Sequence, residues 1–471
     1  MRRSAPTARV LAAFALAWLA PTAALRAQEQ APPPVPAPGP NERVETYPSG
    51  AVQRRYTVDD QGKRHGRCEE FAENGTRTLF AVYSHGLRDG EWKEWRADGQ
   101  KVRYLQYHLD DLHGQCEEFH DNGRTASVGS YREGQRHGKW IETDRDGVRR
   151  KTAEYREGYL HGSLKITVRD KVVSKQTWRD GDLLQLDDLT PLPASQQQLR
   201  RELHAILAAA PSNLDKDDPL AAERQQALRR LAAYRRLCGL SFADLMLVPE
   251  WNLRCDAAAE ACRRLGHLDH TPPQPPDMDP ARYRLGYEGA SHSNLASGGS
   301  LEASVDQYMD DSDGSNIDRV GHRRWCLNPP LRKTGFGHDG GYSAMWSMDE
   351  SGNGKTAVDF VAYPPHGYTP TDLFDARRAF SIGTRKGAVK KDDLKVDITA
   401  LDDDWGPSGK PLDLDWCSPA AGGFGGLNYI VFRPVGIEVS IGAKYLVEVS
   451  TDGGKTKEYR YLVAFCAPTD G

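Results

Sequence analysis

The sequence predicts a multidomain α+β protein. An antiparallel β-hairpin repeat array comes first, a helical central region follows, and a β-sandwich ends the chain. Helical periodicity begins after Asp182, and alternation of polar and apolar residues returns from Tyr445 onward. The N-terminal third instead has a period of 24 residues, which marks stacked structural units. Its clearest column is glycine: Gly66, Gly90, Gly114, Gly138 and Gly162. A chain of 471 residues is also too long for one core.

The first residues have the layout of a secretory signal peptide, which we place at residues 1–27. Two arginines precede an apolar run from Val10 to Ala20, and this run is too short to span a bilayer. We therefore expect export, to the periplasm or the extracellular space, with a retained N-terminal membrane anchor as the alternative. Residues 28–48 are rich in proline and predict an extended linker.

The charge balance argues against nucleic acid as a partner. The chain has 62 lysines and arginines against 66 aspartates and glutamates, which gives a net charge of −4. Nucleic-acid binding needs a strongly basic face to neutralise phosphates. We therefore expect a partner of another class.

Residues 49–182 form the repeat region. In each unit an Asn-Gly or Asp-Gly pair, such as Asn74-Gly75, separates two short segments rich in aromatic and β-branched residues. These pairs favour the two-residue hairpin turn with positive φ. A Gly-x-x-x-Gly segment, as from Gly86 to Gly90, then links one hairpin to the next. Each unit is therefore expected to be one hairpin, and the array a long antiparallel meander.

The recurring pattern Tyr-x-x-Gly-x-x-x-Gly-x-Trp/Cys-x-x-Trp/Phe resembles the MORN family in its bacterial variant. The resemblance covers most of the array. It implies a scaffold that contacts a protein or cell-surface partner, and no chemistry of its own.

Helical signals begin in residues 183–217, a linker expected to contain one helix with a capping box at Ser195. Residues 218–365 are predicted as the next domain, with helices from Asp218 to Gly239 and from Trp251 to about Leu265. Beyond them the chain becomes rich in glycine, aspartate and histidine. The residues that resemble a chemical site lie there: His267, His270, Glu288, His292 and His322.

Segments of this central region are similar to the CAP superfamily, the cysteine-rich secretory, antigen and pathogenesis-related proteins. The similarity lies in Leu231-x-x-Tyr234-Arg235, in Glu288-Gly289 followed by Ser293-Asn294-Leu295-Ala296, and in Gly321-His322-Arg323. It implies a three-layer α-β-α sandwich. The family's cleft can hold a divalent metal between two histidines and two acidic residues.

The metal site that this resemblance implies is incomplete in this chain. Glu288 and His322 match their positions, but Ala258 stands where the family has its helical histidine. Three aspartates of the segment 306–311 lie nearby, and none of them has a clear match. A site that lacks half its ligands loses most of its metal affinity.

We assign no catalytic residue from the sequence. The candidate cleft residues are Glu288, His322, His270 and His292, and the candidate metal ligands are His270, Glu288 and His322. We expect no cofactor, with a divalent metal as the alternative. The sequence has neither a Gly-x-Ser-x-Gly elbow nor a His-Glu-x-x-His motif. It therefore leaves enzymatic activity open and leans against it.

Residues 366–471 predict an immunoglobulin-like or fibronectin-like β-sandwich. Alternating segments around Tyr445 and Tyr459 flank an Asp-Gly-Gly turn. Cys417 and Cys466 could form a disulfide within this sandwich, and two buried thiols are the equal alternative.

Together these patterns favour an exported modular binding or scaffold protein whose CAP-like cleft is incomplete. Two alternatives stay open. One is a metal-dependent hydrolase that uses Glu288 and His322 with His270 or His292. The other is a carrier that holds a lipid or small molecule in the same cleft.

Overall fold

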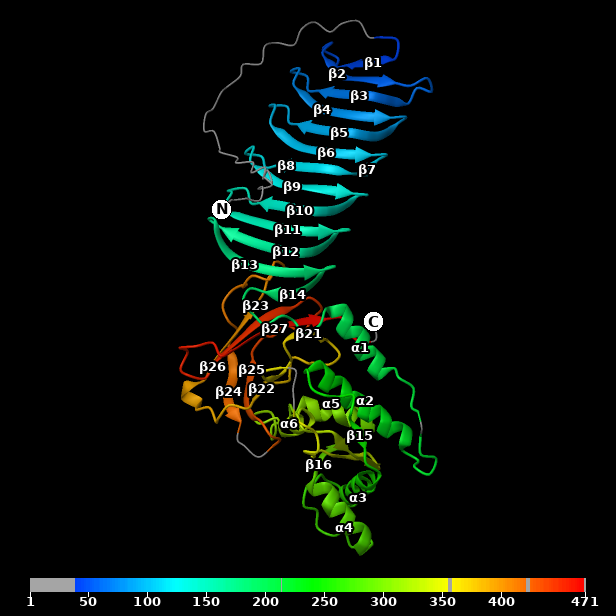
Figure 1. Cartoon of the computed structure of the whole chain (residues 1–471), viewed down its shortest axis with the longest axis vertical. Coiled ribbons are helices and arrows are strands. Elements are labelled where there is room, and N and C mark those ends of the chain that lie inside the picture. Colours follow the sequence, from blue (N-terminus) through cyan, green and yellow to red (C-terminus); the bar gives the residue numbers. More distant parts are fainter. Residues whose placement is uncertain (1–38, 213, 355–357, 421–423, 470–471) are drawn as a thin grey trace, which may run out of the picture. The chain divides into compact units, whose positions relative to one another are not determined.

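The computed structural model describes residues 39–212, 214–354, 358–420 and 424–469, and Figure 1 shows its helices and strands. The predicted signal peptide, residues 1–27, and the first part of the proline-rich linker lie outside the described residues. The chain divides into two compact units, Met1–Lys101 and Val102–Gly471, which we describe in turn.

The first unit consists of antiparallel strands that pair in the order of the sequence. They are β1 (Glu42–Thr46), β2 (Val52–Val58), β3 (Arg64–Phe71), β4 (Arg77–Ser84) and β5 (Leu87–Trp95). Cys68 and Ala81 are fully buried at its centre. Aromatic side chains pack against this centre: Tyr56, Tyr83 and Trp92. A single layer of sheet thus buries small residues beneath the rings of neighbouring strands.

The second unit begins with further antiparallel strands. They are β6 (Lys101–His108), β7 (Asp111–Leu112), β8 (Gly114–Phe119), β9 (Thr125–Arg132), β10 (Gln135–Thr143), β11 (Arg149–Arg156), β12 (Tyr159–Val168), β13 (Lys171–Arg179) and β14 (Asp182–Leu186). Trp140 of β10 is buried, with 1% of its surface exposed. A Cβ on Gly129 of β9 would overlap its indole ring, so glycine at this position makes room for the tryptophan.

Two kinds of turn alternate along the repeats, and the sequence assigned them the wrong way round. At Asn74-Gly75 the amide of Gly75 donates to Ala72 O at 2.8 Å, and only the glycine has a positive φ, of 82°. The two-residue turn with positive φ lies instead between successive 24-residue repeats, at His85 (47°) and Gly86 (94°). A longer loop needs one left-handed residue, whereas the two-residue turn needs two.

The glycine with the 24-residue period lies in a β-bulge rather than in a turn. Gly66 has a φ of 93°, and the register of β2 and β3 shifts between Tyr56 and Val58, opposite it. A Cβ on Gly66 would lie 2.6 Å from Thr57 Oγ1. Positive φ and close approach of the neighbouring strand both favour glycine here.

The second unit also contains the helices (Figure 1). They are α1 (Gln196–Leu207), α2 (Ala221–Leu237), α3 (Pro249–Leu265), α4 (Pro280–Ser291), α5 (Leu301–Asp310) and α6 (Gly321–Cys326). Ser195 caps α1 by accepting from Gln198 N at 3.1 Å. α3 ends at Gly266 in the left-handed conformation, so the segment that carries His267 and His270 follows the helix. Among the described residues, no helix is long and apolar enough to cross a bilayer.

Four small sheets complete the second unit. β16 (Ser293–Ser297), β19 (Tyr342–Trp346) and β18 (Phe336–Asp339) form one antiparallel sheet, and β15 (Met246–Leu247) pairs in parallel with β17 (Lys333–Thr334). The other two sheets follow the orders β20-β22-β25-β24 and β21-β27-β26-β23. Their strands are β20 (Val361–Tyr363), β21 (Gly367–Pro370), β22 (Phe380–Thr384), β23 (Lys395–Ala400), β24 (Leu414–Ala420), β25 (Asn428–Pro434), β26 (Lys444–Ser450) and β27 (Tyr459–Cys466).

The fold class predicted from the sequence is wrong. The described chain is mostly β, with a 14-stranded antiparallel sheet, and its central part shows no α-β-α sandwich. The central sheet has only three short strands, β16, β18 and β19, and α2 and α5 bury their apolar faces in a core shared with the C-terminal strands. In the C-terminal part, β21 and β27 pair in parallel, whereas the other strand pairs of these two sheets are antiparallel.

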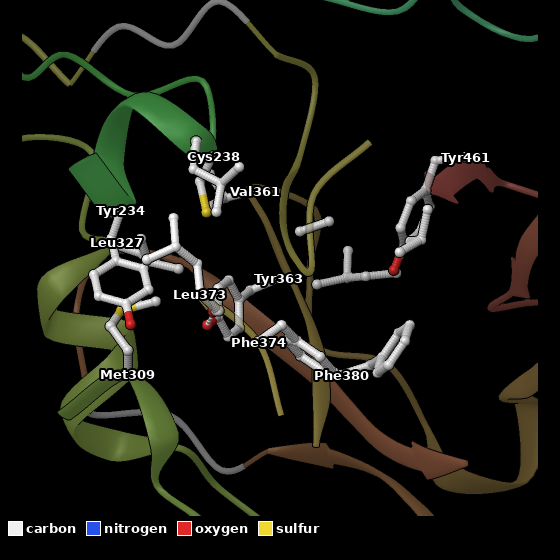
Figure 2. Close-up of a cluster of buried hydrophobic side chains, with 14 of the residues drawn as sticks. Tyr234, Cys238, Met309, Leu327, Val361, Tyr363, Leu373, Phe374, Phe380 and Tyr461 are labelled. Atoms are coloured by element: carbon white, nitrogen blue, oxygen red, sulfur yellow. Dashed lines mark hydrogen bonds between the residues drawn. The ribbon is translucent and has the colours of Figure 1, made fainter. Parts of the chain in front are cut away.

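One hydrophobic core connects the helices with the C-terminal strands (Figure 2). The rings of Tyr234 on α2 and Tyr363 on β20 lie 6.1 Å apart. Phe374 packs against both Tyr363 and Phe380, at 5.4 Å from each ring. All four side chains are buried. The core therefore crosses the boundary that the sequence predicted between residues 365 and 366.

A fully buried arginine, Arg235 of α2, holds the irregular backbone between α6 and β17. A guanidinium has five N–H groups, and those of Arg235 donate to five carbonyl oxygens at 2.8–3.3 Å. The acceptors are Ser241, Cys326, Asn328, Pro329 and Leu331. Burial lowers the pKa of Arg235 to about 10. The side chain thus replaces regular secondary structure as the hydrogen-bond partner of this segment.

The last strands of the repeat sheet are fixed to a loop of the C-terminal part. The Asp404 carboxylate binds Arg149 Nη2 at 2.5 Å and Lys151 Nζ at 2.8 Å. Its backbone carbonyl accepts from Gln176 Nε2 at 2.6 Å, and the rings of Trp178 and Trp405 lie 6.1 Å apart. Both charged and aromatic contacts therefore join β11 and β13 to this loop.

We expect Arg235→Lys to lower the free energy of unfolding by at least about 3 kcal/mol, because lysine cannot supply five donors and leaves buried carbonyl oxygens unpaired. Urea denaturation followed by tryptophan fluorescence measures the change. The neighbouring Arg236→Lys is the matched control, since Arg236 pairs with the partly exposed Glu202. Arg236→Lys should lower the free energy of unfolding by less than about 1 kcal/mol. Equal losses for the two variants would contradict the role of Arg235.

Candidate functional site

The structure brings two of the four predicted cleft residues together. His322 lies in the first turn of α6, and His270 lies in the loop that follows α3. Their rings are 6.4 Å apart. Glu288 lies on α4 and His292 at the end of α4, and both have other partners.

His322 is held by a buried carboxylate. Its Nδ1 lies 2.7 Å from Asp311 Oδ1, and the Asp311 side chain has only 1% of its surface exposed. The second carboxylate oxygen accepts from the amide of Arg323 at 3.0 Å. Because a carboxylate only accepts, the proton lies on Nδ1 of His322 and the lone pair of the neutral ring lies on Nε2.

Unusual backbone geometry on both sides places this pair. Asp311 ends α5 with a φ of 47°, and Val320 begins α6 with a φ of 44°. A β-branched residue in the left-handed region is strained, and such strain collects at functional sites. Asn294 of β16 donates from Nδ2 to the carbonyl of His322 at 3.0 Å and fixes the first turn of α6 from the other side.

His270 presents the same arrangement as His322. Its Nδ1 donates to the carbonyl of Ala290 at 3.0 Å, so the Nε2 of the neutral ring again carries the lone pair. Within the described parts of the chain, neither imidazole has a hydrogen bond at Nε2. Both histidines line one pocket of about 550 Å³.

The pocket has a polar side and an apolar side. The polar residues beside the histidines are Ser291, Ser293, Asn294, Ser315, Asn316 and Arg319. The apolar residues are Leu268, Leu295, Trp325, Met348 and Phe424. The Arg319 guanidinium stacks over the ring of Phe424 at 5.5 Å and donates from Nε to Asn316 Oδ1 at 3.2 Å. An arrangement of this kind suits a small molecule with one polar end.

Glu288 and His292 do not line this pocket. Glu288 Oε2 lies 2.9 Å from Arg254 Nε, and the Glu288 side chain is 47% exposed. The His292 ring stacks on Trp346 at 4.7 Å with an interplanar angle of 7°, and its Nδ1 lies 2.9 Å from the Glu288 carbonyl. Glu288 therefore forms an ion pair with Arg254 of α3, and His292 stacks on Trp346 at the end of β19.

The residues proposed as metal ligands do not form a metal site in the described structure. His270, Glu288 and His322 do not converge, and the described residues contain no group of three or more His, Cys, Asp or Glu side chains that could hold a metal ion. Asp311 supplies the only carboxylate bound to His322 among the described residues, and both its oxygens accept hydrogen bonds from protein donors.

The cysteines proposed as a disulfide are both free. Cys417 lies on β24 and Cys466 on β27, which belong to different sheets. Burial raises the pKa of each thiol to about 12. In this state they are unreactive thiols.

Comparisons with known proteins give no family for this chain. No protein-family model matches it, and no curated protein matches it at a significant level.

Sequence reasoning missed the importance of Asp311 and Arg319. Asp311 is one of three aspartates near His322 in the sequence, and in the structure it has a left-handed backbone and its carboxylate contacts the imidazole. The signal that could have found it is the short spacing between Asp311 and the His-Arg pair of α6. No sequence signal marks Arg319, whose place in the pocket depends on the distant Phe424.

We expect Asp311→Asn to lower the free energy of unfolding by about 2 kcal/mol, because it weakens two buried hydrogen bonds at once. In NMR spectra the downfield Nδ1 proton of His322 should also disappear. Asp318→Asn, an exposed change in the same loop, is the control and should alter neither quantity. An Asp311→Asn protein as stable as the wild type would show that the carboxylate does not hold His322.

Proposed function

We propose that this protein is an exported modular binding protein. Its His270–His322 pocket binds a small amphipathic carboxylate, and its repeat sheet contacts a protein or cell-surface partner. One observation carries the pocket assignment. Each imidazole has its Nδ1 occupied by a fixed acceptor, which leaves two Nε2 atoms available to one ligand in the same pocket.

The lining of the pocket supports the class of ligand. Arg319 can donate to a carboxylate, and so can His322 once its Nε2 takes up a proton, which leaves an imidazolium beside the Asp311 carboxylate. Trp325, Met348 and Phe424 offer an apolar wall for a hydrocarbon chain. Ligand pockets commonly combine an apolar lining with a few polar groups that fix orientation.

Hydrogen bonds between successive turns support the proposal that the repeat sheet contacts a partner. Asn74 donates from Nδ2 to Ala97 O at 3.0 Å, and Asn122 donates to Arg145 O at 2.8 Å. In both repeats, the asparagine of the turn thus bonds to the corresponding turn of the next repeat, at the same spacing in the sequence. A surface fixed in this way loses little conformational entropy when a partner binds.

Octanoate is a suitable probe for the pocket. At saturating concentration we expect it to raise the melting temperature of the full chain by about 5 °C. His322→Gln should raise the dissociation constant at least about tenfold, measured by isothermal titration calorimetry. His267→Gln removes an exposed histidine close in sequence that does not line the pocket, and it should bind octanoate as the wild type does. The ligand class is wrong if both variants bind octanoate equally well.

The Asp311–His322 pair also favours a second function, ester hydrolysis without a metal. A carboxylate that orients Nδ1 and stabilises the imidazolium is the arrangement that lets Nε2 act as a general base. In this reaction Nε2 takes a proton from water as the oxygen attacks the ester carbonyl. The tetrahedral carbon then expels the alkoxide, which takes up the proton from Nε2 and leaves as the alcohol, and the ester carbonyl ends as a carboxylic acid.

Hydrolysis of p-nitrophenyl octanoate tests this second function. We expect the wild type to exceed an equal concentration of free imidazole by about a hundredfold or more, as general-base catalysis provides. His322→Gln should remove the excess and His267→Gln should keep it. If the wild type only matches free imidazole, the hydrolase assignment fails while ligand binding stands.

A further inference from the structure

Three lysines gather in a recess on one face of the repeat sheet. The recess has a volume of about 510 Å³ and extends over β10 to β14. Lys139 comes from β10, Lys165 from β12 and Lys175 from β13, and all three are exposed. Uncharged donors lie between them: Thr152, Ser163, Thr177 and Gln185.

Strand register places two of these charges directly opposite each other. Lys165 and Lys175 are paired residues of β12 and β13, so their side chains leave the same face of the sheet. Directly opposed residues lie about 5 Å apart at Cβ, and like charges in such pairs destabilise a sheet. The fold thus retains an unfavourable pair that a single glutamate would make favourable.

Two carboxylates also line the recess: Glu154, which lies directly opposite Lys139 in the sheet, and Asp187. Glu154 accepts from the Ser163 hydroxyl at 3.0 Å, and Asp187 accepts from the backbone amide of Lys175 at 2.7 Å. In the described structure, no carboxylate lies within ion-pair distance of the ammonium group of Lys139, Lys165 or Lys175. The recess therefore has three ammonium groups against two carboxylates, an excess of one positive charge on a protein whose net charge is −4.

We propose that this recess binds an acidic segment of a protein partner, rich in aspartate and glutamate. The inference rests on the proposed contact of the repeat sheet with a partner and names its chemistry. Lys139 and Lys175 lie three strand spacings apart, about 14 Å, which is too far for one small anion and suits successive carboxylates on a chain. Thr152, Ser163, Thr177 and Gln185 can then bind the backbone amides of that segment.

The nature of the recess argues against the other polyanions. Lysine is a compact point charge, whereas bidentate phosphate recognition favours arginine. No aromatic side chain lines the recess, so it lacks the stacking surface that single-stranded nucleic acids use. An acidic polypeptide needs neither feature.

The test measures binding of a fluorescein-labelled oligoglutamate peptide to the full chain by fluorescence anisotropy. The double variant Lys165→Gln/Lys175→Gln should bind about tenfold more weakly than the wild type. Lys171→Gln removes an exposed lysine of the same strand outside the recess and should stay within about twofold of the wild type. Raising the salt concentration to about 0.5 M should abolish binding of the wild type, because the contacts are exposed charges.

Stability and competition complete the test. The double variant should melt no lower than the wild type, because it removes a like-charge pair. If the double variant melts lower, the single variant Lys139→Gln takes its place in the binding test. Lys139→Gln should then show the same loss of binding. Alginate or anionic phospholipid vesicles that bind tighter than oligoglutamate would overturn the inference, as would equal losses for Lys171→Gln and the double variant. A wild type that binds octanoate but not oligoglutamate overturns this inference alone and leaves the proposed pocket intact.

Discussion

Buried guanidinium groups hold the irregular backbone of the second unit, and the position of the candidate site depends on them. Arg235 binds carbonyl oxygens between α6 and β17, while Arg323 donates to Met309, Asp310 and Ala379 at 2.7–2.8 Å. Arg324 reaches Phe424 O at 3.0 Å. Burial lowers the pKa of all three arginines, so keeping them charged inside the protein costs free energy. That cost is offset because the carbonyl groups they bind would otherwise be buried without partners.

The same arginines explain how His322 comes to face a pocket. Successive residues of a helix point about 100° apart, so α6 can direct Arg323 into the core and His322 away from it. Arg323 also presents its backbone amide to Asp311, whose other oxygen holds the imidazole. The residue that joins α6 to the C-terminal sheets thus also binds, through its backbone amide, the carboxylate that holds the candidate site. The packing of the core and the orientation of His322 therefore depend on the same residue, Arg323.

Local features could be predicted from the sequence, and long-range packing could not. The Ser195 cap and the end of α3 at Gly266 follow from residue types that act over one turn. The turn types were exchanged, because Asn74-Gly75 lies in a longer loop whose length no dipeptide reveals. The predicted α-β-α sandwich failed for a similar reason, since an apolar helix face does not say which sheet will cover it. At the site, His270 and His322 could be found from the sequence, whereas Glu288 turned instead to Arg254 on the neighbouring helix.

The contact between Asp404 and the last repeat strands sets a limit on how this protein can vary in evolution. Repeats of one hairpin are gained and lost by duplication and deletion of whole units, and most units here contact only their neighbours in the sheet. β11 and β13 also contact the loop of Asp404 and Trp405, so they have to change together with it. Homologues should therefore differ in repeat number upstream of Arg149, while the units that carry Arg149, Lys151 and Trp178 stay in place. Two of the three recess lysines, Lys165 and Lys175, lie within this end of the array, whereas Lys139 lies upstream of Arg149.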